Sequence, residues 1–307
     1  MMIDTHRHNM QGIALILLGA LLLSVMDGVI KILLERDFSV LQILAVRSWF
    51  VAPVMLIWAW RSLPSEALRT KRPGLHFVRV LVGFFAPLAF FKALQTMALA
   101  DATVIFFGTT FVMTALSVPL LKEYVGPHRW AAVIVGFVGV MIAANPGGDF
   151  FQSGAVYALL ASFAYAVFML ITRWMGRKGD DVGEGAFKQV LYFNVWVGVV
   201  ASTLIWADFK PMSAIDVGWV ALAGAFAVAG HLSLTRAFSI APIGLVAPFE
   251  YSAMVWAGLI GFVLWGHVPG LSTVVGAGVI VASGLYLLHR ETRIKPATAA
   301  HPHGIDL

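Results

Sequence analysis

Long apolar segments recur along this chain, and their length restricts the folds it can adopt more than any other feature. Runs of eighteen or more mainly apolar residues follow one another from near Gly12 to near His289. Each run is long enough to cross a hydrocarbon core of roughly 30 Å as an α-helix. The alternation of apolar and polar residues that marks the strands of a membrane barrel is absent from the sequence. We therefore predict an all-α membrane protein.

Composition supports this prediction, because hydrophobic residues make up 60% of the 307 residues and charged residues only 12%. Soluble globular proteins carry about 25% charged residues, and no single core could bury this much apolar surface. The first segment is too long for the apolar region of a signal peptide, so we expect it to be retained. Ten membrane-spanning helices are predicted, at residues 12–33, 40–60, 76–98, 101–121, 129–145, 153–174, 187–207, 216–238, 244–265 and 271–289.

Lys and Arg residues lie mainly in one set of connecting segments. If the N-terminus is cytoplasmic, twelve of them fall on the cytoplasmic side, and Arg36 and Lys210 fall on the other side. Because basic loops stay in the cytoplasm, both termini are predicted to be cytoplasmic. The net charge of +5 is therefore a topology signal rather than a nucleic-acid-binding surface. Residues 290–307 are predicted to form a disordered cytoplasmic tail.

The same sequence pattern occurs twice in the chain. GIALILLGALLLSVMDGVIKIL (12–33) aligns with GAVYALLASFAYAVFMLITRWM (154–175), and QILAVRSWF (42–50) aligns with QVLYFNVWV (189–197). Each half holds five predicted spans, an odd number, so the second half must begin on the opposite side of the membrane. Inverted repeats with a polar site near the membrane centre are typical of secondary transporters.

Two inverted five-helix repeats are therefore predicted, over 12–145 and 153–289. With this layout the chain resembles the EamA family of the drug/metabolite transporter superfamily. The resemblance is also carried by the basic residue that ends the first span of each half, Lys31 and Arg173. LLKEYVGPHRWAAVIVGFVGVMI (120–142) is similar to the family signature that joins the fourth and fifth helices, although His267 replaces the acid of that signature in the second half.

The resemblance implies a multi-pass transporter of the bacterial inner membrane, without a cofactor. It further implies that helices one to four of each half surround a central cavity, while helices five and ten stand to the side. A small molecule and the lipid bilayer are the expected partners, and association of two copies as a homodimer is left open.

Ionisable residues inside the spans are candidates for function, because an Arg, Lys or Asp at a helix centre costs roughly 2.5–3.5 kcal/mol on insertion scales. Arg47 and its repeat partner Asn194 are both polar, so this position is predicted to face a cavity. Arg47 either contacts substrate or has a structural role, such as pairing with Asp27. Asp27 lies four residues before Lys31, and it either pairs with that lysine or exchanges protons or contacts substrate in the cavity.

Glu250 follows Pro248 inside the ninth predicted span. Proline removes a backbone hydrogen bond, and interrupted helices at membrane depth mark transporter binding sites. Glu250 is therefore a candidate for substrate or proton binding. A fixed salt bridge to Lys92 or Arg236, which the repeat also aligns with each other, is the alternative.

Aromatic side chains near these charges could stack on a planar substrate or hold a cation, although most such residues in membrane proteins pack or mark the interface. Lys31 and Arg173 could instead extend to the membrane surface, and Arg79 and Lys188 are expected to be cytoplasmic anchors. His231 is either a proton-coupling residue or a hydrogen-bonded helix contact. The predicted substrate site is Arg47, Trp49, Lys92, Phe111, Asn194, Trp196, Arg236, Glu250 and Tyr251, with Asp27, Glu250 and His231 as proton-coupling candidates.

The leading functional prediction is a secondary transporter of a small organic metabolite that works by alternating access, by proton coupling, by exchange or by facilitated diffusion. Basic residues outnumber acids within the spans, which favours a carboxylate-bearing or zwitterionic, amino-acid-like substrate. An exporter or facilitator of neutral, aromatic or cationic compounds is the alternative. No HExxH or GxSxG motif supports an intramembrane enzyme, the chain has no cysteine, and no metal site is predicted.

Overall fold

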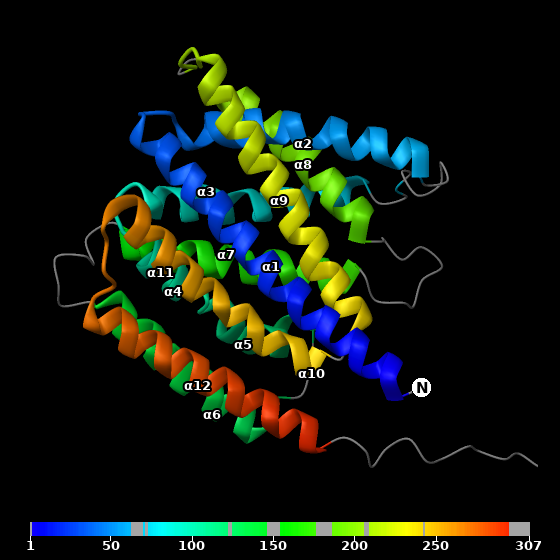
Figure 1. Cartoon of the computed structure of the whole chain (residues 1–307), viewed down its shortest axis with the longest axis vertical. Coiled ribbons are helices and arrows are strands. Elements are labelled where there is room, and N and C mark those ends of the chain that lie inside the picture. Colours follow the sequence, from blue (N-terminus) through cyan, green and yellow to red (C-terminus); the bar gives the residue numbers. More distant parts are fainter. Residues whose placement is uncertain are drawn as a thin grey trace, which may run out of the picture.

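The computed structural model describes residues 2–62, 70, 73–121, 125–145, 154–175, 186–205, 209–241 and 243–294. Every regular element within these ranges is helical, in agreement with the predicted all-α class (Figure 1). The elements are α1 (Met2–Glu35), α2 (Val40–Ser62), α3 (Pro73–Leu94), α4 (Leu99–Phe106), α5 (Thr109–Leu121), α6 (Pro127–Ala144), α7 (Gly154–Met175), α8 (Ala186–Ile205), α9 (Ala214–Ile240), α10 (Ile243–Val246), η3 (Ala247–Tyr251), α11 (Ser252–Trp265) and α12 (Leu271–Ile294).

The apolar segments of the sequence become the long helices. Among the described residues, nine helical segments are long and apolar enough to cross a membrane, and α8 adds a shorter one, Val190–Ile205. These segments correspond to the ten predicted spans. α12 continues to Ile294, into the predicted tail, and residues 295–307 of that tail lie outside the described residues.

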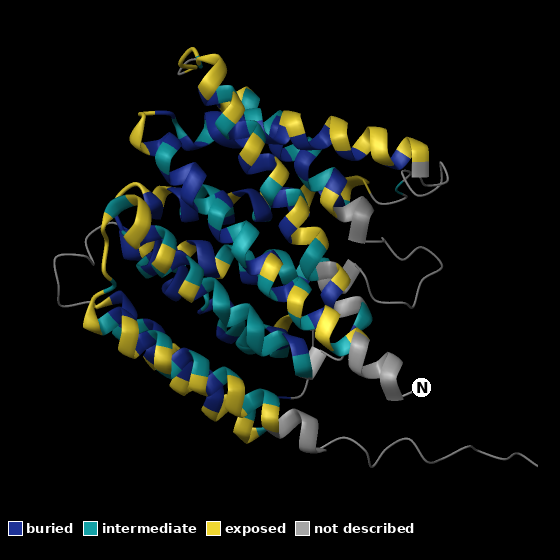
Figure 2. Cartoon of the chain, in the orientation of Figure 1, coloured by how far each residue is buried: buried dark blue, intermediate teal, exposed yellow. Residues whose placement is uncertain are grey.

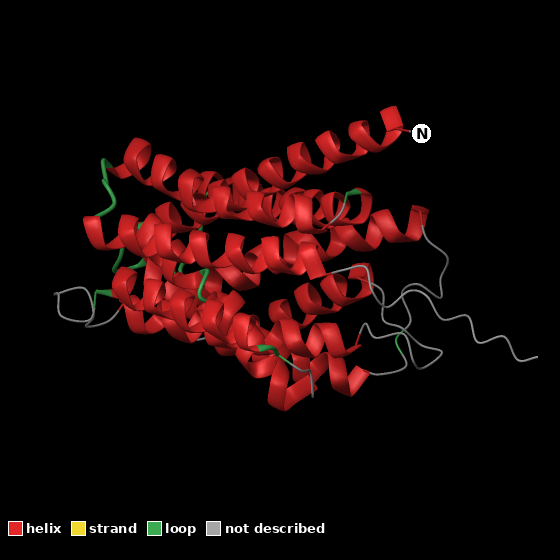
Figure 3. Cartoon of the chain, turned by 90° about the horizontal axis from the view of Figure 1, so that it is seen from below, coloured by secondary structure: helices red, strands yellow, loops and turns green. Residues whose placement is uncertain are grey.

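The helices form one bundle and run roughly along a common direction (Figures 1 and 3). α1 packs most extensively against α9, α3 against α7, α2 against α8, and α6 against α12. The α2–α8 pair lies at one edge of the bundle in Figure 1, and the α6–α12 pair lies at the opposite edge. α1 begins and α12 ends at the same end of the bundle.

Glycines allow two of these helix pairs to approach closely. A Cβ atom on Gly19 of α1 would lie 3.1 Å from the Gly230 carbonyl oxygen of α9. A Cβ atom on Gly276 of α12 would lie 2.6 Å from the Gly139 carbonyl oxygen of α6. In lipid, where apolar surface gives helices little reason to associate, small residues strengthen packing by bringing backbones together.

Two membrane segments are interrupted, and the interruptions meet. α4 ends at Phe106 and α5 begins at Thr109, while Pro248 lies in a stretch of 3₁₀-helix, η3, before α11. The Phe107 and Tyr251 rings, one from each interruption, lie 5.4 Å apart. The break at Pro248 follows from the missing backbone donor, whereas nothing in the sequence between Leu99 and Leu121 predicted the other break.

The outward faces of the bundle are apolar, as Figure 2 illustrates for α2 and α12, which carry many exposed residues. On α2, Val54, Ile57 and Trp58 are at least half exposed. Apolar surface of this extent is stable in hydrocarbon, and helices satisfy their own backbone hydrogen bonds there. The interior holds the remaining apolar residues, together with several charges.

Candidate functional site

Arg47 is a buried cation in α2 with few partners. It is 8% exposed, its Nη1 atom lies 3.6 Å from the Met26 sulfur, and its guanidinium carbon lies 5.8 Å from the centre of the Phe91 ring. Its Nε atom has no hydrogen-bond partner within the described ranges. A guanidinium carries five N–H donors, and a buried charge is costly unless it is paired and hydrogen-bonded. Arg47 therefore keeps N–H groups that could donate hydrogen bonds to an anionic group of a ligand.

Two other predicted site residues lie near Arg47. Asp27 of α1 and His231 of α9 both interact electrostatically with it, although His231 is an exposed residue. The structure therefore brings together three polar residues from α1, α2 and α9 that are far apart in the sequence. Asp27 is partly exposed, whereas Arg47 is 8% exposed.

The predicted alternative, an ion pair between Asp27 and Lys31, does not form. The Lys31 amine donates to the carbonyl oxygens of Leu94 at 2.7 Å and Met97 at 3.1 Å, and it lies 3.8 Å from the Glu35 carboxylate. The last carbonyls of a helix lack partners inside the helix, so Lys31 caps the end of α3. Lys31 therefore has a structural role at the end of its span. Because it does not pair with Asp27, Asp27 can interact with Arg47.

Aromatic rings connect Arg47 to the middle of the bundle. They come from α3, α4 and α7, and we call Phe91, Phe90, Phe106, Tyr165 and Phe168 the aromatic ladder. Successive ring centres along the ladder lie 6.2, 5.0, 5.2 and 6.0 Å apart. These separations are typical of interacting aromatic pairs. Phe106, Tyr165 and Phe168 keep part of their surface accessible, although they belong to interior faces of the bundle.

A second buried arginine lies at the other end of the ladder. Arg79 is 2% exposed, its guanidinium carbon lies 4.9 Å from the Phe168 ring centre, and its Nη1 atom donates to the Thr172 hydroxyl at 3.0 Å. The prediction that Arg79 is a surface anchor is therefore wrong. Arg79 lies near the beginning of α3, which suggested a surface position, but its side chain points at α7. Lys188, the other predicted anchor, has a side chain outside the described residues.

Glu250 lies in η3, beside the ladder. It is partly exposed and interacts electrostatically with Tyr165 and Tyr251. The ion pairs found within the described residues join Lys31 to Glu35 and Arg36 to Asp216, so neither of the salt bridges considered for Glu250 is among them. The Tyr251 hydroxyl packs against Gly284 of α12.

The remaining predicted residues lie apart from this group. Phe111 is 1% exposed and packs its ring against Gly136 of α6. Trp49 is 49% exposed and donates from Nε1 to the Ser202 hydroxyl at 2.9 Å.

Residues that the repeat aligns with one another make different contacts in the two halves. Asn194 is buried, but its side-chain amide donates to the Val190 carbonyl of its own helix at 3.0 Å. Trp196 packs edge-on against Phe77, with ring centres 5.3 Å apart. Lys92 and Arg236 are exposed, and the Arg173 side chain lies outside the described residues. Equivalent positions of the two halves therefore carry different interactions.

The site that geometry assembles is thus Asp27, Arg47, Glu250 and the aromatic ladder, and the exposed His231 interacts with it only electrostatically. None of the ladder residues was predicted as part of the site, because single aromatic residues in an apolar span look like packing residues, and Arg79 was predicted only as an anchor. The spacing of Tyr165 and Phe168 places them on one helix face, but that signal is common. Within the part of the chain that the structure describes, no three His, Asp or Glu residues cluster as metal ligands.

Comparisons with known proteins agree on one family. The family described as "EamA-like transporter family" matches residues 10–145 and 152–288. The chain is 25% identical to the S-adenosylmethionine uptake transporter of Rickettsia prowazekii, covering 94% of this chain and 96% of the relative. It is also 25% identical to the riboflavin transporter of Vibrio cholerae, covering 93% and 95%. One solved protein structure superposes with a TM-score of 0.60 at 15% identity, over 95% of this chain and 99% of the other, and this likeness shows the fold alone.

Proposed function

The chain belongs to the EamA-like transporter family, and we propose that it is a secondary transporter that moves a zwitterionic or carboxylate-bearing metabolite with a planar ring across the bacterial inner membrane. The two relatives compared above are named as transporters of small metabolites, and neither name describes an enzyme. The observation that carries the substrate proposal is Arg47, a buried guanidinium with an unpartnered Nε beside Asp27.

The substrate class follows from the groups that surround Arg47. Arg47 would bind a carboxylate through charge-assisted hydrogen bonds, and Asp27 would face the ammonium group of the same molecule. The aromatic ladder offers ring faces on which a planar group could stack. The named substrates of two relatives, S-adenosylmethionine and riboflavin, both contain a planar ring system, and the first also carries an amino-acid group.

Alternating access is supported by the way the helices pair. Under the repeat, α1 corresponds to α7 and α3 to α9, so the α1–α9 and α3–α7 pairs are equivalent. The α2–α8 and α6–α12 pairs each join two corresponding helices. The interrupted fourth segments of both halves also correspond. Pairing of this kind is expected of two inverted repeats, and it would let either half adopt the conformation of the other.

Glu250, Asp27 and His231 are the proposed proton-coupling residues. A carboxyl group in surroundings of low dielectric holds a proton more readily than in water, and such groups are suited to proton exchange. Glu250 adjoins the break at Pro248, where a change of backbone conformation would alter its surroundings. Exchange of one metabolite for another is the alternative, and it would need no titrating group.

A thermal-shift panel tests the substrate class with the purified full chain. We would measure melting with S-adenosylmethionine, riboflavin, phenylalanine and methionine, with choline and glucose as controls. A ligand at about 100 times its Kd stabilises the folded state by about 2.7 kcal/mol. We expect stabilisation by ring-bearing zwitterions and its loss in Arg47→Gln. Stabilisation by choline alone would instead favour the alternative of a cationic substrate.

A further inference from the structure

The two halves of the chain are joined by a polar network at the end of the bundle opposite the beginning of α1. There α1 passes into α2 through residues 36–39, and α8 is followed by residues 209–213 and α9. The first segment belongs to the first family match and the second to the second match. Any motion that separates the two halves at this end must therefore break this network.

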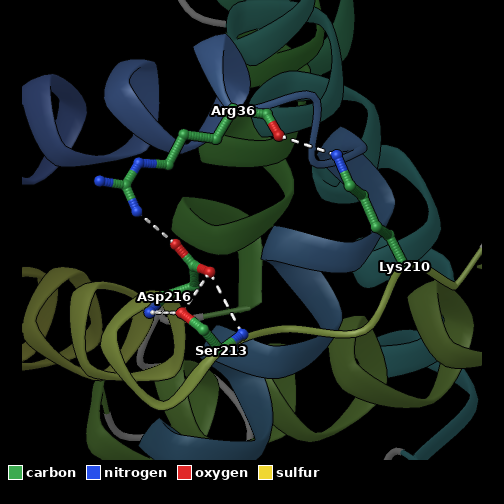
Figure 4. Close-up of polar contacts among 4 residues, drawn as sticks. All are labelled: Arg36, Lys210, Ser213 and Asp216. Atoms are coloured by element: carbon green, nitrogen blue, oxygen red, sulfur yellow. Dashed lines mark hydrogen bonds and ion pairs between the residues drawn. The ribbon is translucent and has the colours of Figure 1, made fainter.

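An ion pair forms the centre of the network (Figure 4). The Arg36 Nη1 atom lies 2.6 Å from the Asp216 Oδ1 atom. The other carboxylate oxygen of Asp216 accepts from the Ser213 hydroxyl at 2.6 Å and from the Ser213 backbone N–H at 3.2 Å. The Asp216 N–H in turn donates to the Ser213 hydroxyl at 3.2 Å, which completes a capping box for α9. The Asp216 carboxylate therefore takes part in both the ion pair and the cap of α9.

A second set of bonds lies beside the ion pair. The Gln42 side chain donates to the Lys210 carbonyl at 2.5 Å and accepts from the Lys210 N–H at 3.2 Å. The Lys210 amine donates to the Arg36 carbonyl at 3.1 Å (Figure 4) and lies 5.4 Å from the Phe38 ring centre. Gln42 is fully buried. Its amide therefore pairs both backbone groups of one residue in the opposite half.

We propose that Arg36–Asp216 and Gln42–Lys210 form a latch that closes this end of the bundle and opens during each transport cycle. Exposure favours such a role, because the Arg36 side chain is 48% exposed and water can replace its bonds when the latch opens. Below the latch lie fully buried apolar residues, including Ile30, Leu33 and Ile43. The inference rests on the proposed function, since a latch has meaning only for a protein that opens at two ends.

Cysteine reporters test the latch without any substrate. The chain contains no cysteine, so Ile43→Cys places a single thiol beneath the latch. Leu170→Cys, in a separate chain, places a buried thiol on α7 close to Thr172, toward the other end. The rate of modification by N-ethylmaleimide would be measured in each purified full-length protein, alone and combined with latch variants.

We expect Arg36→Gln and Asp216→Asn each to raise the modification rate of the Ile43→Cys reporter by about three- to tenfold, the effect of losing a partly exposed charged hydrogen bond. The rate of the Leu170→Cys reporter should stay the same or fall, because the two ends open alternately. Ser213→Ala is the matched control, since it removes the helix cap but leaves the ion pair, and it should change the Ile43→Cys rate by less than about twofold.

Three results would overturn the latch. Equal rates with and without Arg36→Gln would mean that the ion pair does not hold this end closed. A rise at both reporters would mean that the network only stabilises the fold. An increase with Ser213→Ala as large as with Asp216→Asn would assign the effect to the helix cap. None of these results depends on finding a substrate, so failure of the latch is separable from failure of the proposed function.

Discussion

The interior of the bundle and the latch hold their charges in opposite ways. Arg47 in the interior is 8% exposed, and its bonding partner is a thioether. Arg36 in the latch is 48% exposed and bonds a carboxylate that is itself fixed by a helix cap. A poorly partnered buried charge is expensive, whereas a well-partnered charge near water costs little to keep or release. The interior therefore has the form of a ligand site, and the latch has the form of a contact that opens and closes.

The largest effect is expected from Arg47→Gln in the interior. Uptake of the ligand found in the thermal-shift panel, measured in proteoliposomes, should fall by about 30-fold or more, because removing one side of a buried charge interaction costs about 2–5 kcal/mol. Arg61→Gln, at the exposed end of the same helix, is the control and should keep normal uptake. If Arg47→Gln keeps full uptake, Arg47 does not bind the substrate, and the proposed difference between the interior and the latch is wrong.

Glu250→Gln should have the next largest effect. If Glu250 carries a proton during transport, uptake should fall by about tenfold or more, and the remaining uptake should vary less with pH. Asp37→Asn is a suitable control, because Asp37 is exposed with a φ of 61° and Asn tolerates that conformation. A pH profile of Glu250→Gln that parallels the unmodified chain would exclude Glu250 from proton coupling.

A smaller effect is expected in the aromatic ladder. Tyr165→Leu should weaken binding of a ring-bearing ligand by about three- to tenfold, since aromatic contacts are worth roughly 0.5–1.5 kcal/mol beyond their buried area. Tyr165→Phe keeps the ring and should bind nearly as well. The check is a titration of melting temperature against ligand concentration, and equal affinities for the Leu and Phe variants would mean that the ring does not stack on the ligand.

The smallest effect is expected for Gln42→Ala in the latch. Loss of its amide should raise the modification rate of the Ile43→Cys reporter by about two- to fivefold, because a neutral hydrogen bond contributes about 0.5–1.5 kcal/mol and water can replace part of the two bonds to Lys210. Uptake should change by less than in any interior variant. If uptake falls as far as in Arg47→Gln, the interior and the latch do not have the separate roles of ligand site and closing contact.

Hydropathy predicted the bundle more accurately than it predicted the site. Each predicted span corresponds to a helical segment, two of them interrupted, because the length and apolar character of a segment are local properties that decide its transfer into lipid. The site residues could not be predicted in the same way, because the direction in which a side chain points depends on tertiary packing, which is not a local property. Arg79 was expected at the surface but lies buried against Phe168, and Lys31 was expected to extend outward but caps α3.

The sequence by itself determined a helical protein for which lipid is the solvent, its duplicated pattern, and two polar residues, Asp27 and Arg47, that the apolar surroundings make costly. Only the tertiary structure decided which of these charges meet, that two helix breaks lie together, and that Arg36 and Asp216 join the two halves. The physical reason is one of range. Transfer into lipid acts on each segment separately, whereas charges and rings pair between residues far apart in the sequence, such as Arg36 and Asp216, which are 180 positions apart.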